Sequence, residues 1–288
     1  MSESTTRIVF VGTGAIGLPM AQRLVGAGYD VTGVDPFEAA RDRAALAGVA
    51  AVPSVREAPD ADLVVVMVAT PGQLDELVES AVATGLVAGK TWVIMSTVGP
   101  ESARTAAQAL ESAGATVLDA PVTGGVARAG TGELVIFASG DPDSLDQVEP
   151  VLAVLGRVRR VGAAVGDGPS IKVVNQHLCS VHLAAAGEAL ALAERLGLDP
   201  QSVFALIKDG AAGSFMLSDR GPRMLSSEAV TVTSSVDIFV KDSGLVSAAA
   251  RATGAVVPIL EAARARFEAA SEAGLGREDD SAVIRTFR

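Results

Sequence analysis

In the first half of the chain, short runs of β-branched and apolar residues alternate with alanine-rich stretches whose apolar residues have helical spacing. The apolar runs are Arg7 to Val11, Tyr29 to Val34, Leu63 to Ala69, Thr91 to Ser96, Thr116 to Leu118 and Leu134 to Ala138. Stretches such as 100–112 and 144–155 start near Pro, Ser or Asp, residues that favour helix starts. This alternation predicts βαβ units, and therefore a parallel sheet with helices on its faces.

After about Gly162 the strand pattern stops, and the chain continues as predicted helices over 171–196, 200–209, 234–252 and 258–273. We therefore predict an α/β fold in two domains, a parallel-sheet domain over 1–163 and an all-helical domain over 164–288. The helix near 170–196 would be about 40 Å long. It is apolar almost all round, so it must be enclosed, and a homodimer or homotetramer is expected.

Composition narrows the class of protein. The chain has 288 residues, of which 49% are hydrophobic, enough for a sizeable core. A formal net charge of -11 opposes binding to nucleic acid or to an anionic membrane surface, since both need a basic footprint. No apolar run reaches the roughly 18 to 20 residues of a membrane span, and no secretory signal is evident. Cys179 is the single cysteine. We expect a cytoplasmic protein without nucleic-acid or membrane partners.

A glycine pattern follows the first predicted strand directly. Ile8 to Val11 leads into Gly12-Thr13-Gly14-Ala15-Ile16-Gly17, and helical spacing begins at Leu18. In a dinucleotide-binding turn the first glycine allows the tight turn, the second lets the backbone approach the pyrophosphate, and the third permits close helix packing. The predicted cofactor-binding residues here are Gly12, Gly14, Ala15, Ile16 and Gly17.

Asp35 ends the second predicted strand, about twenty residues beyond the glycines, where a carboxylate can accept both ribose hydroxyls. It would repel a 2'-phosphate, which favours NAD over NADP. Arg41 and Arg43 lie further on and could restore phosphate binding. The alternative interpretation of Asp35 is a turn-forming residue before Pro36.

Two further segments have candidate chemistry. In Asp119-Ala120-Pro121-Val122-Thr123-Gly124-Gly125, two glycines beside a hydroxyl would expose successive backbone N–H groups, a nest that suits a carboxylate; a plain glycine turn is the alternative. Lys172 lies in Gly168 to Gln176, in a chain with only four lysines, and an amine can lose and regain a proton whereas a guanidinium cannot. The alternative for Lys172 is a solvated helix lysine.

Four motifs together resemble the 3-hydroxyisobutyrate dehydrogenase family of β-hydroxyacid dehydrogenases. They are Gly12 to Gly17, Asp119 to Gly125, Gly168 to Gln176 and Lys241-Asp242-Ser243-Gly244-Leu245, in that order over nearly the whole chain. The resemblance implies a Rossmann domain joined by a long helix to an all-helical domain. It also implies an NAD-dependent dehydrogenase of a small hydroxy acid, with its active site between the domains.

Segments 235–242 and 276–284 resemble the L-threonate dehydrogenase branch, which acts on four-carbon sugar acids. Relatives acting on tartronate semialdehyde, succinic semialdehyde, glyoxylate and 3-hydroxyisobutyrate remain alternatives for the substrate.

The resemblance also implies individual roles. Lys172 matches the catalytic lysine and Asn175 a substrate-orienting amide. Thr123, Gly124 and Gly125 match a carboxylate-binding turn, while Thr97 and Lys241 match a nicotinamide-side threonine and a second lysine beside cofactor and substrate.

There are departures from the family pattern. Gln176 replaces a second asparagine and is expected to contact substrate on a longer arm, Thr123 replaces a serine, and Gly99 replaces another.

Other functions are disfavoured by the same residues. Imine reductases typically lack a lysine at the position of Lys172, and non-enzymatic relatives have lost it. His177 and His182 are five residues apart around Cys179, which does not suit zinc, and we expect no metal. No serine has the setting of an acyl-transfer nucleophile.

Overall fold

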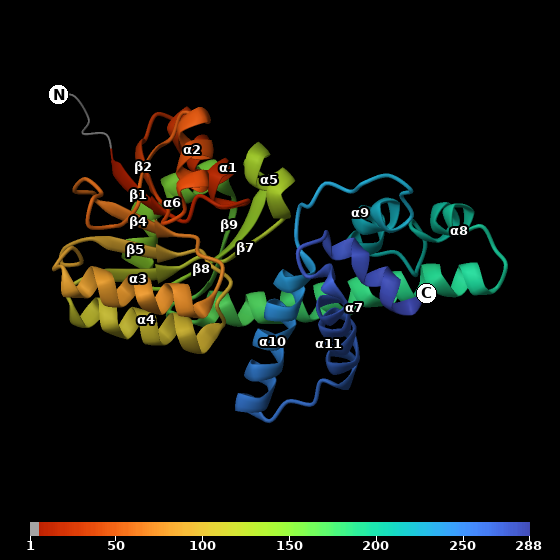
Figure 1. The fold of residues 1–288 in the computed structure, drawn as a ribbon. Helices are drawn as coiled ribbons and strands as arrows, with labels where there is room; N and C mark the ends of the chain where they lie inside the picture. Colours follow the sequence, from red (N-terminus) through yellow and green to blue (C-terminus); the bar gives the residue numbers. More distant parts are fainter. Residues whose placement is uncertain (1–5) are drawn as a thin grey trace. The chain divides into compact units, whose positions relative to one another are not determined.

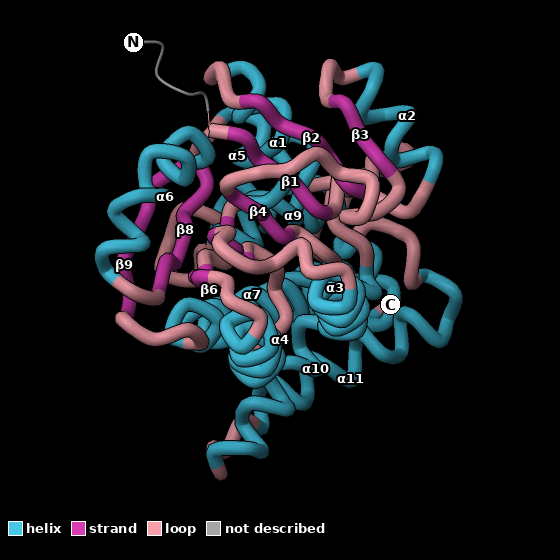
Figure 2. The backbone as a smooth tube through the Cα atoms, turned by 90° about the vertical axis from the view of Figure 1, so that its left-hand side faces the viewer, coloured by secondary structure: helices cyan, strands magenta, loops and turns pink. Residues whose placement is uncertain are grey.

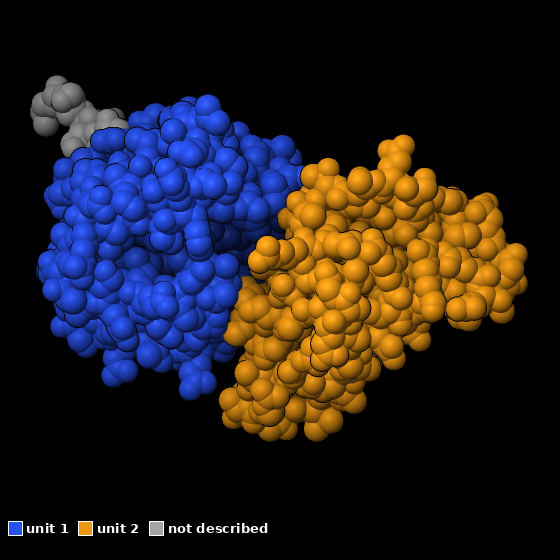
Figure 3. Space-filling view, viewed as in Figure 1, with its two compact units in different colours: residues 1–172 blue, residues 173–288 orange. Residues whose placement is uncertain are grey.

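The computed structural model describes residues 6–288, which fall into two compact units (Figure 1, Figure 3). The first unit ends at Lys172 and the second is Val173–Arg288. The boundary between 163 and 164 suggested by the sequence follows directly on the last strand, and stays a prediction of where the domains part.

The first unit is built on a sheet whose strand order is β3-β2-β1-β4-β5-β6-β8-β7, with β9 paired to β8. The strands are β1 Arg7–Val11, β2 Asp30–Val34, β3 Ala50–Val52, β4 Leu63–Val66, β5 Thr91–Ile94, β6 Thr116–Asp119, β7 Val122–Thr123, β8 Leu134–Ser139 and β9 Gly156–Gly162. Pairing is parallel from β3 to β6 and between β8 and β9, whereas β8 is antiparallel to β6 and β7. The predicted parallel sheet is therefore confirmed, with an antiparallel junction at one side.

Helices cover both faces of this sheet (Figure 2). They are α1 Gly17–Gly26, α2 Glu38–Leu46, α3 Pro71–Ala83, α4 Pro100–Ser112, α5 Gly125–Thr131 and α6 Pro142–Leu155. In β1, Ile8 and Phe10 pack with α1, α2 and α6, whereas Val9 and Val11 pack with α3 and α4. Side chains of a strand alternate between faces, so a strand buried on both must be apolar throughout, as β1 is after its first residue.

One strand lies outside the apolar runs that predicted the sheet. The arginine-rich segment Arg157 to Arg160 forms most of β9. Arg157 and Arg159 are exposed, whereas Val158 packs against the core between them. One face of β9 is exposed, so charged residues can alternate along it while its backbone pairs with β8.

The second unit is helical, as predicted. Its elements are the long helix α7 Asp167–Arg195, which starts in the first unit, then α8 Pro200–Ile207, α9 Phe215–Met224, α10 Val236–Thr253, α11 Pro258–Ala270, a π-turn Ser271–Leu275 and a 3-10 helix Asp280–Phe287. Leu183 and Leu190 of α7 pack with Phe239, Phe267 and Val283 in one core. No helix among the described residues is both long enough and apolar enough to cross a membrane.

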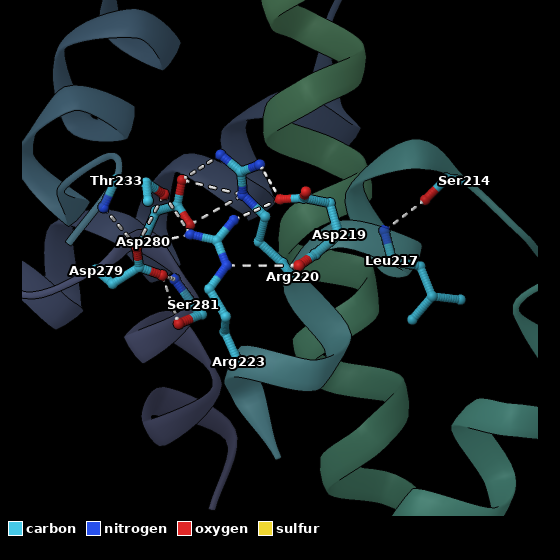
Figure 4. Close-up of polar contacts among 9 residues, drawn as sticks. All are labelled: Ser214, Leu217, Asp219, Arg220, Arg223, Thr233, Asp279, Asp280 and Ser281. Atoms are coloured by element: carbon cyan, nitrogen blue, oxygen red, sulfur yellow. Dashed lines mark hydrogen bonds and ion pairs between the residues drawn. The ribbon is translucent and has the colours of Figure 1, made fainter. Parts of the chain in front are cut away.

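A buried charge network ties α9 to the C-terminal segment (Figure 4). Nη2 of Arg220 lies 2.9 Å from Oδ2 of Asp280, and Nη1 of Arg223 lies 2.8 Å from Oδ2 of Asp279. Asp219 pairs with both arginines at 2.5 Å. Asp279 also accepts a hydrogen bond of 3.1 Å from the backbone N–H of Thr233, so the loop before α10 is held by the same cluster.

Burial shapes the ionisation of this network. Burial raises the pKa of the Asp280 carboxyl, and the hydrogen bonds and charge of Arg220 oppose that rise. For Arg220, burial lowers the pKa, but the hydrogen bonds and charges of Asp280 and Asp219 outweigh it and raise the pKa above its ordinary value. The guanidinium therefore keeps its proton, and its charge compensates the carboxylate of Asp280, which is fully buried.

Replacing Arg220 with Met should destabilise the protein by about 3–5 kcal/mol, because Asp280 would be left buried without its partner. The matched control is Arg285→Met, whose ion pair with Glu278 is 53% exposed on the arginine side and should contribute less than about 1 kcal/mol. Urea unfolding followed by circular dichroism measures both. Equal, small changes in the two variants would contradict a stabilising role for the network.

Candidate active site

Most of the residues singled out in the first unit follow the carboxyl ends of its parallel strands. The glycine turn follows β1, Asp35 follows β2 and Thr97 lies three residues beyond β5. Strand order reverses between β1 and β4, and the crevice at such a reversal is where ligands of open α/β sheets bind. The topology therefore brings these separate motifs to one edge of the sheet.

The glycine turn is closely packed on one side and open on the other. A side chain on Gly17 would start 1.9 Å from the carbonyl oxygen of Gly12, and one on Gly12, where φ is +93°, would start 2.3 Å from the carbonyl oxygen of Met67. At Gly14 a Cβ would meet nothing within 4 Å, and Ala15 is exposed beside it. The open backbone at the start of α1 fits the pyrophosphate of a dinucleotide.

Asp35 is 6% exposed and joins this turn to the end of β2. Its Oδ2 accepts a hydrogen bond of 3.0 Å from the backbone N–H of Thr13, and its Oδ1 accepts one of 3.1 Å from that of Phe37. Nη1 of Arg41 donates to the backbone carbonyls of Asp35 and Pro36 at 2.9 and 2.8 Å. The carboxylate is thus fixed at the end of β2, beside the glycine turn, and Arg41 binds backbone carbonyls next to it.

The residue before Thr97 makes a buried polar contact. Ser96, 1% exposed, accepts a hydrogen bond of 2.8 Å from the N–H of Val68 and so ties the end of β4 to the residue before Thr97.

Thr123 ends β7, and Gly124 and Gly125 follow with φ of +136° and +72°. A Cβ at Gly125 would meet nothing within 4 Å, so space is open beside this turn.

A buried clamp around Asp119 holds the start of α7. Oδ1 of Asp119 accepts a hydrogen bond of 2.5 Å from the hydroxyl of Ser139, Oδ2 accepts one from the N–H of Gly166, and the N–H of Gly168 donates to Oγ of Ser139 at 2.8 Å. A Cβ on Gly168 would lie 2.3 Å from Oδ1 of Asp119, so only glycine fits there. Lys172, 7% exposed, follows on the first turns of this helix.

Burial raises the pKa of Asp119 to about 6, although the hydrogen bonds from Ser139 and Gly166 act to lower it. The hydrogen-bond donors therefore compensate for only part of the cost of removing this carboxylate from water.

In the second unit, α7 and α10 bring together a chain of polar side chains. Nε2 of Gln176 donates to Oδ2 of Asp242 at 2.5 Å, and Nδ2 of Asn175 donates to Oε1 of Gln176 at 2.8 Å and to Sγ of Cys179 at 3.4 Å. Nζ of Lys241 lies 2.9 Å from Oδ1 of Asp242 without the alignment of a hydrogen bond, so this contact is an ion pair. Asp242 is 4% exposed.

The predicted site residues thus fall into two groups, one in each unit. Asn175 and Gln176 lie three and four residues after Lys172 on the continuous helix α7, so the three positions share a helix face. Within residues 6–288 no group of three or more His, Cys, Asp or Glu could hold a metal ion.

Sequence reasoning gave no role to two buried carboxylates, Asp119 and Asp242. Both stand inside motifs that the resemblance used, but a position in a motif does not show what a side chain contacts. The available signal was an acid placed among apolar residues, which needs a partner if it is buried.

Two family models and a relative of known name match nearly the whole chain. Residues 7–166 match a family model described as the NAD binding domain of 6-phosphogluconate dehydrogenase, and residues 166–287 match one described as NAD-binding of NADP-dependent 3-hydroxyisobutyrate dehydrogenase. L-threonate dehydrogenase of Cupriavidus necator is 40% identical over 281 residues, 96% of this chain and 94% of that protein.

Two solved structures are also similar to this chain over nearly its whole length. The crystal structure of 3-hydroxyisobutyrate dehydrogenase from Salmonella typhimurium has a TM-score of 0.89 at 35% identity, covering 98% of this chain and 100% of that chain. Mycobacterium tuberculosis 3-hydroxyisobutyrate dehydrogenase with L-serine has a TM-score of 0.84 at 33% identity, covering 99% and 100%.

The raised pKa of Asp119 predicts a pH dependence of stability. The carboxyl binds its proton more tightly in the folded state, with a pKa of about 6, than at its ordinary value of 3.8. Its protonation therefore stabilises the fold fully below about pH 4, and about 3 kcal/mol is lost as the pH rises through 6. Asp119→Asn, which does not titrate, should lack this loss.

The measurement is the urea-unfolding free energy of wild type and Asp119→Asn at about pH 4, 5 and 7. The variant's free energy minus that of the wild type should increase by about 2 kcal/mol across this range. A difference that stays constant with pH would show that Asp119 is not the titrating group.

Proposed function

Because the chain belongs to the 3-hydroxyisobutyrate dehydrogenase family, NAD-binding dehydrogenases of hydroxy acids, we propose that it oxidises a four-carbon sugar acid, L-threonate, with Lys172 as general acid and base. The observation that supports this proposal most is the buried amine of Lys172, on a helix start fixed by the Asp119 clamp. The similarity to L-threonate dehydrogenases over nearly the whole chain supports the choice of substrate.

The proposed reaction gives each group a task. Lys172 removes the proton of the substrate hydroxyl during oxidation and returns it to the alkoxide oxygen during reduction. Gly12, Gly14 and Gly17 would hold NAD and Asp35 would bind its ribose, and the bound cofactor would supply the hydride acceptor. The cofactor-binding roles of Ala15, Ile16, Thr97 and Lys241 are part of the same proposal.

The substrate carboxylate is assigned to the turn Thr123–Gly125. Its backbone N–H groups follow a partly exposed hydroxyl, and the open space at Gly125 admits a small anion. Asn175, on the same helix face as Lys172, orients the rest of the substrate. Fixing both ends of a small acid sets the distance and angle of hydride transfer, which accounts for much of the rate of such reactions.

A second candidate function is oxidation of 3-hydroxyisobutyrate. It is favoured by the structural similarity to the Mycobacterium tuberculosis enzyme of that name. The two substrates differ in their hydroxyl groups, so rates with a panel of acids separate them.

The test is formation of NADH with L-threonate, D-threonate, erythronate, glycerate and 3-hydroxyisobutyrate. We expect L-threonate to give the highest kcat/KM, and Lys172→Ala to lower kcat by roughly 10²- to 10⁴-fold while NADH binding, measured by fluorescence, is retained. Lys208→Ala, at the C-terminal end of α8, is the matched control and should keep wild-type turnover. Activity retained by Lys172→Ala would remove the assigned role, and no turnover of any acid would remove the function.

We also propose a homodimer or homotetramer. Val174, Leu178 and Leu192 of α7, and Leu196 directly after it, are 63%, 50%, 56% and 66% exposed. Their spacing places them along one side of the helix, and exposed apolar rows of this kind commonly mark protein contacts. A second copy of the chain covers this row in the proposed assembly.

Sedimentation velocity should therefore give a dimer or tetramer for the wild type. Leu192→Glu should shift it toward monomer, because a charge would be buried in the contact. Leu206→Glu, on α8 and 81% exposed, is the control and should not change the assembly. A monomeric wild type would refute the proposal.

A further inference from the structure

We propose that Asp242, acting through Gln176, fixes Asn175 as a hydrogen-bond acceptor toward the substrate. Through this polarity the enzyme selects acids that carry a second hydroxyl beside the reacting one. The inference rests on the proposed function, and the property of the substrate that it adds is the second hydroxyl. Asp242 and Gln176 are positioning residues in it, and Asn175 is the residue that contacts substrate.

The first step is the direction of the Gln176 amide. A carboxylate accepts hydrogen bonds and donates none, so the end of the amide that faces Asp242 must be the NH2 group. Nε2 lies 2.5 Å from Oδ2 of Asp242, while Oδ1 of the same carboxylate is paired with Lys241. Asp242 is 4% exposed and Gln176 7% exposed, so water does not compete for this contact. The amide of Gln176 therefore has one favoured orientation.

In the second step, the orientation of the Gln176 amide determines that of the Asn175 amide. With Nε2 turned toward Asp242, Oε1 of Gln176 faces Asn175 and accepts from its Nδ2 at 2.8 Å. The same Nδ2 lies 3.4 Å from Sγ of Cys179, a weak acceptor, so both of its hydrogens have partners. The carbonyl oxygen Oδ1 of Asn175 is then the end turned away from the chain of polar side chains. Asn175 is partly exposed whereas Gln176 is buried, so it is Asn175 that presents a group to a ligand.

The third step concerns the ligand. A carbonyl oxygen attracts a donor and repels a carboxylate, so the substrate group facing Asn175 must be a donor. In a small hydroxy acid the available donor, apart from the hydroxyl that reacts with Lys172, is a second hydroxyl. Sugar acids carry one, and 3-hydroxyisobutyrate has a methyl group instead. The longer arm of Gln176, which reaches Asp242 on α10, thus contributes to specificity without touching the substrate.

The expected preference follows from the cost of an unmade hydrogen bond. A partly buried acceptor left without its donor costs about 1–3 kcal/mol, which corresponds to roughly 5- to 150-fold in kcat/KM. Discrimination of this size is easily measured.

The experiment compares kcat/KM for L-threonate with those for 2,4-dihydroxybutanoate and 3,4-dihydroxybutanoate, each lacking one hydroxyl. The acid that keeps the reacting hydroxyl but lacks its neighbour is the informative one. Wild type should prefer threonate over it within the expected range. In Asp242→Asn, residue 242 can donate as well as accept, so the amides of Gln176 and Asn175 can adopt either orientation, and most of the wild-type preference should be lost.

The matched control is Asp237→Asn, the same substitution at an exposed position of the same helix, which should leave the preference unchanged. A purely structural role for Asp242 would lower kcat/KM for both acids by the same factor and leave their ratio intact, and this result would overturn the inference. Gln176→Leu, similar in size but without the amide, should also lose the preference, and it decides the question if Asp242→Asn does not fold.

The outcomes separate the two proposals. If the wild type oxidises none of the acids with NAD, the proposed function fails and the inference fails with it. If it oxidises them and the ratio is unchanged in Asp242→Asn or Gln176→Leu, only the inference fails. An analogue with an ammonium group in place of the second hydroxyl is also a donor, and its turnover at a rate close to threonate would show that Asn175 reads any donor rather than a hydroxyl.

Discussion

The contact on which the structure of the candidate site depends is the buried carboxyl of Asp119. This carboxyl accepts hydrogen bonds from the hydroxyl of Ser139 and the N–H of Gly166, and the Ser139 hydroxyl oxygen accepts one from the N–H of Gly168. These groups attach the end of β6 and the end of β8 to the first residues of α7. The next turn carries Lys172, so the backbone at this position is attached to the sheet rather than to a free loop.

Burying this carboxylate costs free energy, and the cost is reflected in the pKa of Asp119, which burial raises to about 6. A buried carboxylate with few donors is poorly compensated, yet it accepts hydrogen bonds in a defined direction and so orients the N–H groups at a helix start. The position is also selective at Gly168, because any side chain there would meet the carboxylate.

Three buried acids orient their neighbours around the candidate site residues. Asp35 holds the backbone of the glycine turn, Asp119 holds the start of α7, and Asp242 holds the amide of Gln176. None of the three needs to exchange a proton with substrate in the proposed reaction, which leaves that task to Lys172. This division is economical, because a carboxylate is an acceptor only and therefore leaves no ambiguity in the groups that face it.

The fold could be predicted largely from periodicity. Strands such as Arg7–Val11 are apolar on both faces, and only a central strand of a covered sheet has that pattern, whereas the helical region shows the longer period. The strand Gly156–Gly162 was not predicted because its three arginines interrupt the apolar run that marked the other strands. The helix Phe215–Met224 was not predicted, and Gly221 and Pro222 within it are residues that usually end helices.

The sequence by itself determined the two-part architecture, the NAD turn and the family, because these depend on local backbone chemistry and on motifs that stay contiguous along the chain. The roles of Lys172, Thr123 and Asn175 remain predictions. Only the tertiary structure decided which way the side-chain amides point and which acids are buried. Asp242 lies 66 residues from Gln176 along the chain. Because folding brings the two residues together, no local sequence pattern can predict their contact.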